Sequence, residues 1–127
     1  MFAPQLEAYQ NVQKSKVMSG REIEAAALTR CALMLAACRN NWHAMGRDKH
    51  LQEALRNDQI VWSILQSELV RDDNPLPIEI RNSILTLSVF IDKRILEMMA
   101  HPDPEKLKIL VDINLNLAAG LRGSPSD

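Results

Sequence analysis

A proline-marked corner between two apolar helical patterns constrains the fold of this chain more than any other feature. The corner runs from Arg71 to Pro77, with the sequence R-D-D-N-P-L-P. Each proline disfavours the α-helical conformation of the residue before it, so no continuous helix can pass through this corner. The sequence therefore predicts one helix over residues 48–70 and a second over residues 78–100, with Pro77 at the start of the second.

Both predicted helices have apolar side chains at alternating steps of three and four residues, which places them on one face. These two apolar stripes are Leu51, Leu55, Trp62, Leu65 and Leu69 in the first helix, and Ile80, Ile84, Leu87, Ile91, Ile95 and Met98 in the second. Other apolar residues widen the second stripe almost all the way round the helix. We therefore expect the helix over residues 78–100 to be the central one.

Another helix is predicted over residues 20–45, before this hairpin. Ser19 and Glu22 have the spacing of a capping box at its start. Its apolar stripe continues to Met45, and alanines beside the stripe permit close approach of a neighbouring helix. Gly46 is the expected stop, with Asp48 as the N-cap of the next helix.

The two ends of the chain complete the predicted organisation. Asp103 and Pro104 have the N-cap and first-turn chemistry of a last helix, which ends near residues 120–123. Residues 1–16 form a weakly apolar pattern that predicts a short first helix, which either docks on the bundle or frays from it. A length of 127 residues fits one domain. We predict an all-α fold: a single small bundle of about five helices, mostly antiparallel, over residues 1–122, with a disordered tail over residues 123–127.

The sequence contains no pattern typical of an enzyme, a cofactor site or a metal site. Its three histidines, His43, His50 and His101, lack metal-ligand spacing. Cys31 and Cys38 are seven residues apart on one helical pattern, about 10 Å between Cα atoms, which is too far for a disulfide. We therefore expect two reduced core thiols and no catalytic, cofactor-binding or metal-binding residues.

Charge and hydropathy exclude two further classes of partner. The net charge is -1, and basic residues do not cluster with aromatic ones, so direct nucleic-acid binding is not expected. The longest uninterrupted apolar run, residues 31–38, is far shorter than the ~20 residues of a membrane-spanning helix. No basic-then-apolar leader opens the chain. We expect a cytoplasmic protein without membrane insertion.

Polar residues interrupt the apolar stripes at two places. Asn57, Asp58 and Gln59 occupy the step between Leu55 and Trp62 where an apolar residue is expected. Such a gap indicates either a buried polar network or contact site, or a shift of the helix face with the polar group facing water. Asn114 lies on the stripe of the last helix, where it is either satisfied inside the fold or holds a partner's backbone. Trp62 is expected as a core anchor, with a partner-facing position as the alternative.

The stretch from residue 57 to residue 91 resembles the FlaF family of flagellar biosynthesis regulators from alphaproteobacteria. The resemblance rests on N-x-x-x-x-W at Asn57 and Trp62, on Glu68-Leu69, on the N-P-L-P corner, and on Arg81 and Ile84 in the next helix. Upstream, Ala8-Tyr9 and R-E-I-E-A at residues 21–25 are similar to the opening of the family. Downstream, residues 110–121 are similar to its closing helix, so the resemblance covers nearly the whole chain.

The resemblance implies a cytoplasmic, non-enzymatic factor required for flagellin production and filament assembly. It implies flagellin as the client, bound in the manner of a secretion chaperone, and the flagellin-translation repressor FlbT as a possible partner. The alternative is a post-transcriptional regulator that acts through FlbT or the transcript without binding flagellin. Flagellin ends carry amphipathic helical patterns, which suit a groove between helices. We expect such a groove between the helices over 48–70 and 78–100, with these partner-binding residues: Asn57, Gln59, Trp62, Leu65, Leu76, Pro77, Arg81 and Ile84.

Overall fold

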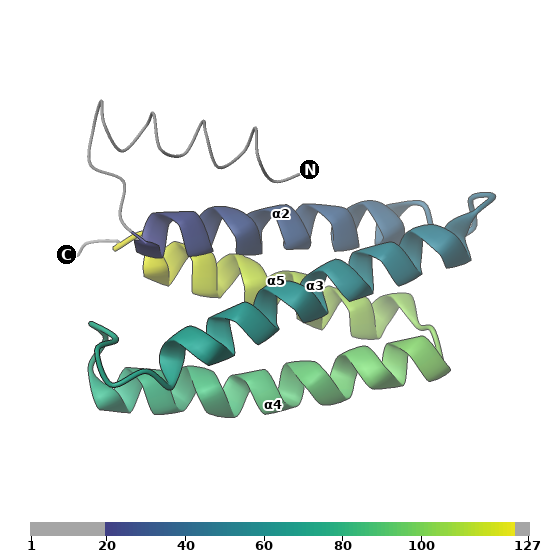
Figure 1. Cartoon of the computed structure of the whole chain (residues 1–127). Coiled ribbons are helices and arrows are strands. Elements are labelled where there is room, and N and C mark those ends of the chain that lie inside the picture. The colour runs from purple at the N-terminus through teal and green to yellow at the C-terminus, as the bar shows by residue number, and fades with distance from the viewer. Residues whose placement is uncertain (1–19, 124–127) are drawn as a thin grey trace.

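A computed structural model describes residues 20–123, and residues 1–19 and 124–127 lie outside the described part. The described residues form no strand and four α-helices: α2 (Gly20–Asn40), α3 (Arg47–Leu69), α4 (Ile78–Ala100) and α5 (Pro104–Leu121). Consecutive helices run antiparallel and are joined by short connections (Figure 1). The predicted all-α, mostly antiparallel bundle is confirmed for this part of the chain. The predicted helix over residues 1–16 and the capping residue Ser19 fall outside it.

The closest packing in the bundle is between α2 and α5. Both helices bury small residues: Ala25 and Ala32 in α2, and Ala118 in α5. An alanine methyl lets two helix backbones approach more closely than a larger side chain does. Helix α3 crosses this pair and packs on both α2 and α4, as Figure 1 shows.

Each of the four described helices packs on two others, so the prediction that α4 is central is wrong. Among the described elements it packs on α3 and α5 but not on α2. One stripe, which includes Ile84, Ile91 and Ile95, is sufficient for these contacts. Ile80 was expected in that stripe but is 47% exposed. Apolar residues all round a helix therefore do not make it central, and the described part of the fold leaves the outer side of α4 uncovered.

The connection between α2 and α3 also differs from the prediction. Helix α2 ends at Asn40, five residues before the predicted end at Met45, and Met45 is 98% exposed. Gly46 has a φ of 80° and is the N-cap of α3, so it reverses the chain at the start of α3 and does not terminate α2. Asp48, the predicted N-cap, lies in the first turn.

The left-handed backbone of Gly46 gives a direct test of this connection. We expect Gly46→Ala to lower the free energy of unfolding by about 1–2 kcal/mol, because a Cβ is unfavourable in that conformation. Gly120→Ala is the matched control, since Gly120 is helical with open space around its Cα. That change is expected to raise the free energy of unfolding by up to about 1 kcal/mol. Urea denaturation measures both, and equal effects would contradict the assigned role of Gly46.

Side-chain hydrogen bonds hold the corner between α3 and α4. Asn74 accepts from the Leu76 backbone N–H at 3.0 Å through Oδ1, and its Nδ2 donates to the Glu68 carbonyl at 2.9 Å. Arg81 donates to the Arg71 carbonyl at 3.0 Å. Helix α4 has the predicted bounds, with Pro77 as its N-cap. The corner therefore fixes the angle between the end of α3 and the start of α4.

The start of α5 agrees with the prediction in detail. Asp103 is the N-cap, its side chain accepts from the Glu105 backbone N–H at 2.9 Å, and Pro104 is the first helical residue. Gly123, the first residue of the predicted tail, has a φ of 71° after α5. None of the four described helices is long and apolar enough to cross a membrane.

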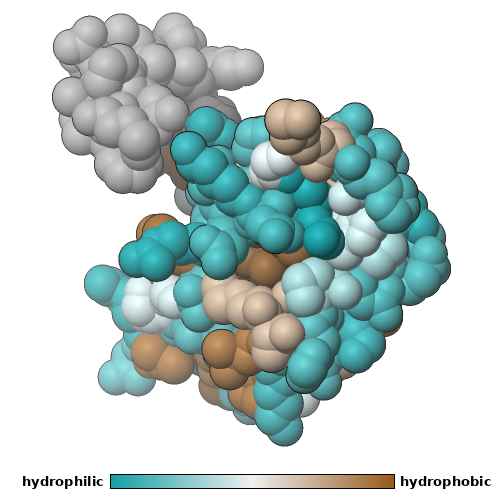
Figure 2. All heavy atoms as spheres, turned by 90° about the vertical axis from the view of Figure 1, so that its right-hand side faces the viewer, coloured by the Kyte–Doolittle hydropathy of each residue, from teal (hydrophilic) through white to brown (hydrophobic). Residues whose placement is uncertain are grey.

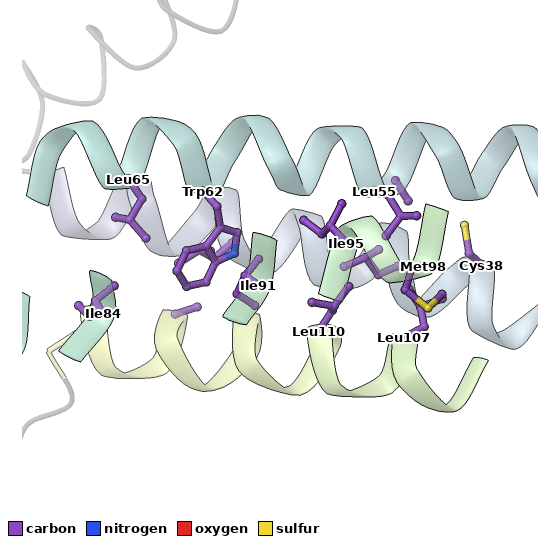
Figure 3. Packing of buried hydrophobic residues seen from close by; sticks show 14 of the residues in the cluster. Cys38, Leu55, Trp62, Leu65, Ile84, Ile91, Ile95, Met98, Leu107 and Leu110 are labelled. Atoms are coloured by element: carbon purple, nitrogen blue, oxygen red, sulfur yellow. The ribbon is translucent and has the colours of Figure 1, made fainter. Parts of the chain in front are cut away.

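A single cluster of buried apolar side chains fills the space between the four described helices. Trp62 points from α3 into this cluster, towards α5, with Ile91 of α4 beside it (Figure 3). Trp62 is the largest fully buried side chain among the described residues. The expectation that it anchors the core is therefore confirmed.

Candidate functional site

The polar gap in the α3 stripe is part of a buried network with Trp62 and Asn114. The Trp62 indole N–H donates to Asn114 Oδ1 at 2.9 Å, and Asn114 Nδ2 donates to Asp58 Oδ1 at 2.8 Å. All three side chains are fully buried. Of the two interpretations of the gap, the buried network is confirmed. Asn114 is satisfied by side chains inside the fold, which ties α5 to α3.

Burial changes the ionisation of the acidic member of this network. Burial raises the pKa of Asp58 from 3.8 to about 6, and the hydrogen bond from Asn114 lowers it in part. The second carboxyl oxygen, Oδ2, has no hydrogen-bond partner among the described residues, and the Cys31 thiol donates to the Asn57 carbonyl at 3.9 Å. A carboxylate with so few donors is poorly solvated, and its protonated form is favoured.

Cys31 is an unreactive thiol in this network. Burial, followed by the negative charge of Asp58, raises the pKa of the thiol to about 12. Asn57 donates from Nδ2 to Cys31 Sγ and to Met34 Sδ, each at 3.3 Å. Cys38 is also free and buried, so the prediction of two reduced core thiols is confirmed. Nucleophilic chemistry requires the thiolate, which this environment disfavours.

The eight predicted partner-binding residues lie in four environments. Trp62, Leu65 and Ile84 have exposures of 0%, 3% and 6%, so their side chains are in the core. Leu76, Pro77 and Arg81 form or brace the corner, where Leu76 packs against the core. Asn57 is half-buried against the two sulfur atoms. Gln59, also half-buried, lines an exposed groove.

That groove lies between α3 and α4 and is called here the α3–α4 groove. Its lining residues are Gln59, Ile60, Ser63 and Ile64 from α3, and Asp92 and Leu96 from α4. Ile60, Ile64 and Leu96 are 50%, 58% and 60% exposed. Gln66 Nε2 donates to Asp92 Oδ2 at 3.3 Å, which joins the two helices beside the groove. Three large apolar side chains thus border one groove. The groove lies between two helices, and the corner fixes the angle between them.

Ile60, Ile64 and Leu96 are absent from the predicted site. The sequence contains a signal for them, because each is apolar but lies off the main stripe of its helix. Ile60 and Ile64 are one turn apart on α3, and Val89, also exposed, lies two turns before Leu96 on α4. Apolar pairs off the core stripe, at helical spacing, indicate a second apolar face.

The end of the bundle at the α2–α3 connection has a different surface. Figure 2 looks onto the end formed by the α2–α3 connection and the start of α5, which is mainly hydrophilic with small hydrophobic areas. The depression beside the α2–α3 connection combines Met34, Cys38 and Met45 with Arg47, His50 and Glu53 in its lining. No group of three or more metal-ligand side chains occurs within residues 20–123. The arrangement is suited to binding an apolar segment.

Comparison with known families places the chain in a family. The family model described as "Flagellar protein FlaF" matches residues 5–121, which is most of the chain. Neither the comparison with curated proteins nor the comparison with solved structures gave a match.

Proposed function

The chain belongs to the flagellar protein FlaF family, and from this premise we propose that it binds flagellin and accompanies it towards export. It acts as a binding protein in the cytoplasm, in the manner of a secretion chaperone. The bound element is an amphipathic helical segment at an end of flagellin. The observation that supports this proposal most is the α3–α4 groove with its exposed apolar border.

The groove has the features that a helical client needs. An amphipathic helix binds a groove through apolar side chains spaced at i, i+3 or i+4, and i+7. Ile60 and Leu96 border the groove on its two opposite helices. Gln59 and Asp92 in the same lining provide polar atoms that can hydrogen-bond to the client. Apolar side chains left exposed on two adjacent helices are typical of a binding surface when they are contiguous.

The corner at residues 71–77 supports this role indirectly. Its hydrogen bonds hold α3 and α4 at one angle before any client arrives, and a preformed groove lowers the conformational entropy lost on binding. In this account Leu76, Pro77 and Arg81 position the groove, whereas Trp62, Leu65 and Ile84 support it from the core.

The groove assignment predicts the effect of removing its apolar border. We expect the double variant Ile60→Ser, Leu96→Ser to bind a flagellin C-terminal peptide at least about tenfold more weakly. Burying one Leu or Ile side chain is worth ~1.5–3 kcal/mol, and 1.4 kcal/mol corresponds to a factor of ten in affinity. Isothermal titration calorimetry with the purified protein measures this. Both residues are exposed, so their replacement is expected to change the free energy of unfolding by less than about 0.5 kcal/mol each.

Leu33→Ser is the matched control for this experiment. Leu33 is 63% exposed on α2, close to the 60% of Leu96, and among the described elements α2 does not contact α4. The control is expected to bind the peptide as the unsubstituted protein does. Equal weakening by the control and the double variant would contradict the groove assignment. Recovery of FlbT but not flagellin in co-purification would instead support the alternative, regulation without flagellin binding.

A further inference from the structure

A second apolar groove lies between α2 and α3, on the other side of Ile64. Its lining consists of Ile23, Glu24, Ala27 and Leu28 from α2, and Val61, Ile64 and Leu65 from α3. Nearly all of these side chains are apolar. No described element covers this groove, although it begins three residues after the start of α2. We call it the α2–α3 groove.

We propose that residues 1–16 of the same chain pack into the α2–α3 groove as an amphipathic helix. In this sequence Phe2, Leu6, Tyr9 and Val12 recur at helical spacing, with Gln, Glu and Asn between them. A weakly apolar helix of this length is marginal by itself and requires a partner surface. The proposal concerns this chain alone and does not depend on flagellin binding.

The length of the connection restricts where such a helix can dock. Three residues, 17–19, separate it from Gly20. Extended chain spans at most ~3.6 Å per residue, so these residues reach only about 11 Å. Ile23 and Glu24 lie in the first turns of α2, so the α2–α3 groove begins within that reach. A helix from Pro4 to residue 16 is about 20 Å long, enough to run along the groove past Ala27 and Val61.

Charge complementarity favours the same occupant. Glu24 lies at the groove, where burial and the nearby negative charge of Glu68 raise its pKa and the positive charge of Arg21 lowers it in part. Two carboxylates close together at one end of an apolar groove favour a positively charged neighbour. Residues 1–16 carry Lys14 and Lys16 at the end that joins α2. The basic end of the segment and the acidic end of the groove therefore coincide.

Paramagnetic relaxation in the full-length protein tests this proposal. A nitroxide is attached at Asn11→Cys, on the polar side of the segment opposite Leu6 and Tyr9. The two native thiols are buried, and the unsubstituted protein treated with the same reagent is the control for labelling. We expect the methyl signals of Ile23 and Ile64 to lose most of their intensity, while that of Ile109 near the start of α5 is retained. Adding Leu6→Asp and Tyr9→Asp to the labelled protein is expected to restore both signals.

Three results would overturn the proposal. One is a similar, weak loss at all isoleucine methyls. A second is a loss centred on residues outside the α2–α3 groove. A third is a loss at Ile23 and Ile64 that appears as strongly when labelled protein is mixed with separate, isotope-labelled protein, because the occupant would then be a second copy of the chain.

Discussion

Replacing Trp62 with alanine is expected to lower the free energy of unfolding by about 3–5 kcal/mol, the usual effect of truncating a large core side chain. Trp62 is fully buried between α3, α4 and α5, so its removal leaves a cavity that the surrounding helices fill only in part. The change also removes the donor to Asn114 Oδ1. A buried acceptor that loses its partner costs about 1–3 kcal/mol. For a domain of this size, such losses are a large fraction of the total stability.

Urea denaturation followed by circular dichroism measures this loss, and Trp62→Phe separates its two causes. Phenylalanine retains much of the buried apolar volume but has no N–H, so it is expected to lose about 1–3 kcal/mol, mainly through the unpaired Asn114 oxygen. If Trp62→Ala had the same denaturation midpoint as the unsubstituted protein, the core position of Trp62 would be wrong.

The second large effect is a dependence of stability on pH that comes from Asp58. Its pKa is 3.8 when exposed and about 6 in the fold, so the folded state holds its proton more tightly than the unfolded state. Below about pH 4 the carboxyl is protonated in both states, so it does not lower the free energy of unfolding. As the pH rises from about 4 to about 6, the carboxyl ionises in the unfolded state while it stays protonated in the fold, so the free energy of unfolding falls. Above about 6 the carboxyl is ionised in both states and this loss stays constant. At neutral pH the fold is therefore less stable by about 3 kcal/mol, since one pKa unit corresponds to about 1.4 kcal/mol.

Asp58→Asn is the variant that tests this effect. Asparagine can still accept from Asn114 through its Oδ1 but does not ionise. We expect the difference in free energy of unfolding between variant and unsubstituted protein to shift in favour of the variant by about 2–3 kcal/mol between about pH 4 and about pH 7. Chemical denaturation across this range measures it. Parallel curves at all pH values would show that Asp58 is ionised in the fold without penalty.

The helix boundaries that the sequence predicts best are those marked by proline. The bounds of α4 and the start of α5 agree with the structure, because Pro75, Pro77, Pro102 and Pro104 restrict the backbone locally. The end of α2 was predicted five residues late. The reason is that a glycine such as Gly46 can mark either the end of one helix or the start of the next. Only the packing of the connection decides between these two positions.

Long-range features of the site could be predicted only in part. The polar gap at residues 57–59 indicated a buried network as one of two possibilities, but its partner Asn114 lies 56 residues away from Asp58. Periodicity places residues on a helix face and does not show which faces meet. For the same reason the apolar outer side of α4 was predicted as core, whereas Leu96 is exposed beside the α3–α4 groove.

Together these observations divide the apolar residues of α3 and α4 into two sets with different roles. Trp62, with its hydrogen-bonded partners, holds the helices together. Ile60, Ile64 and Leu96 remain exposed at the groove that we propose for flagellin. Substitutions in the first set are expected to act on stability, and substitutions in the second set on binding.

Titration of the methyl-labelled, full-length protein with a flagellin C-terminal peptide, followed by NMR, tests the central proposal most directly. The proposal predicts saturable chemical-shift changes that are largest at the methyl groups of Ile60, Ile64 and Leu96, with little change at Leu33. The absence of saturable changes, or changes centred on Leu33 and the outer side of α2, would contradict it.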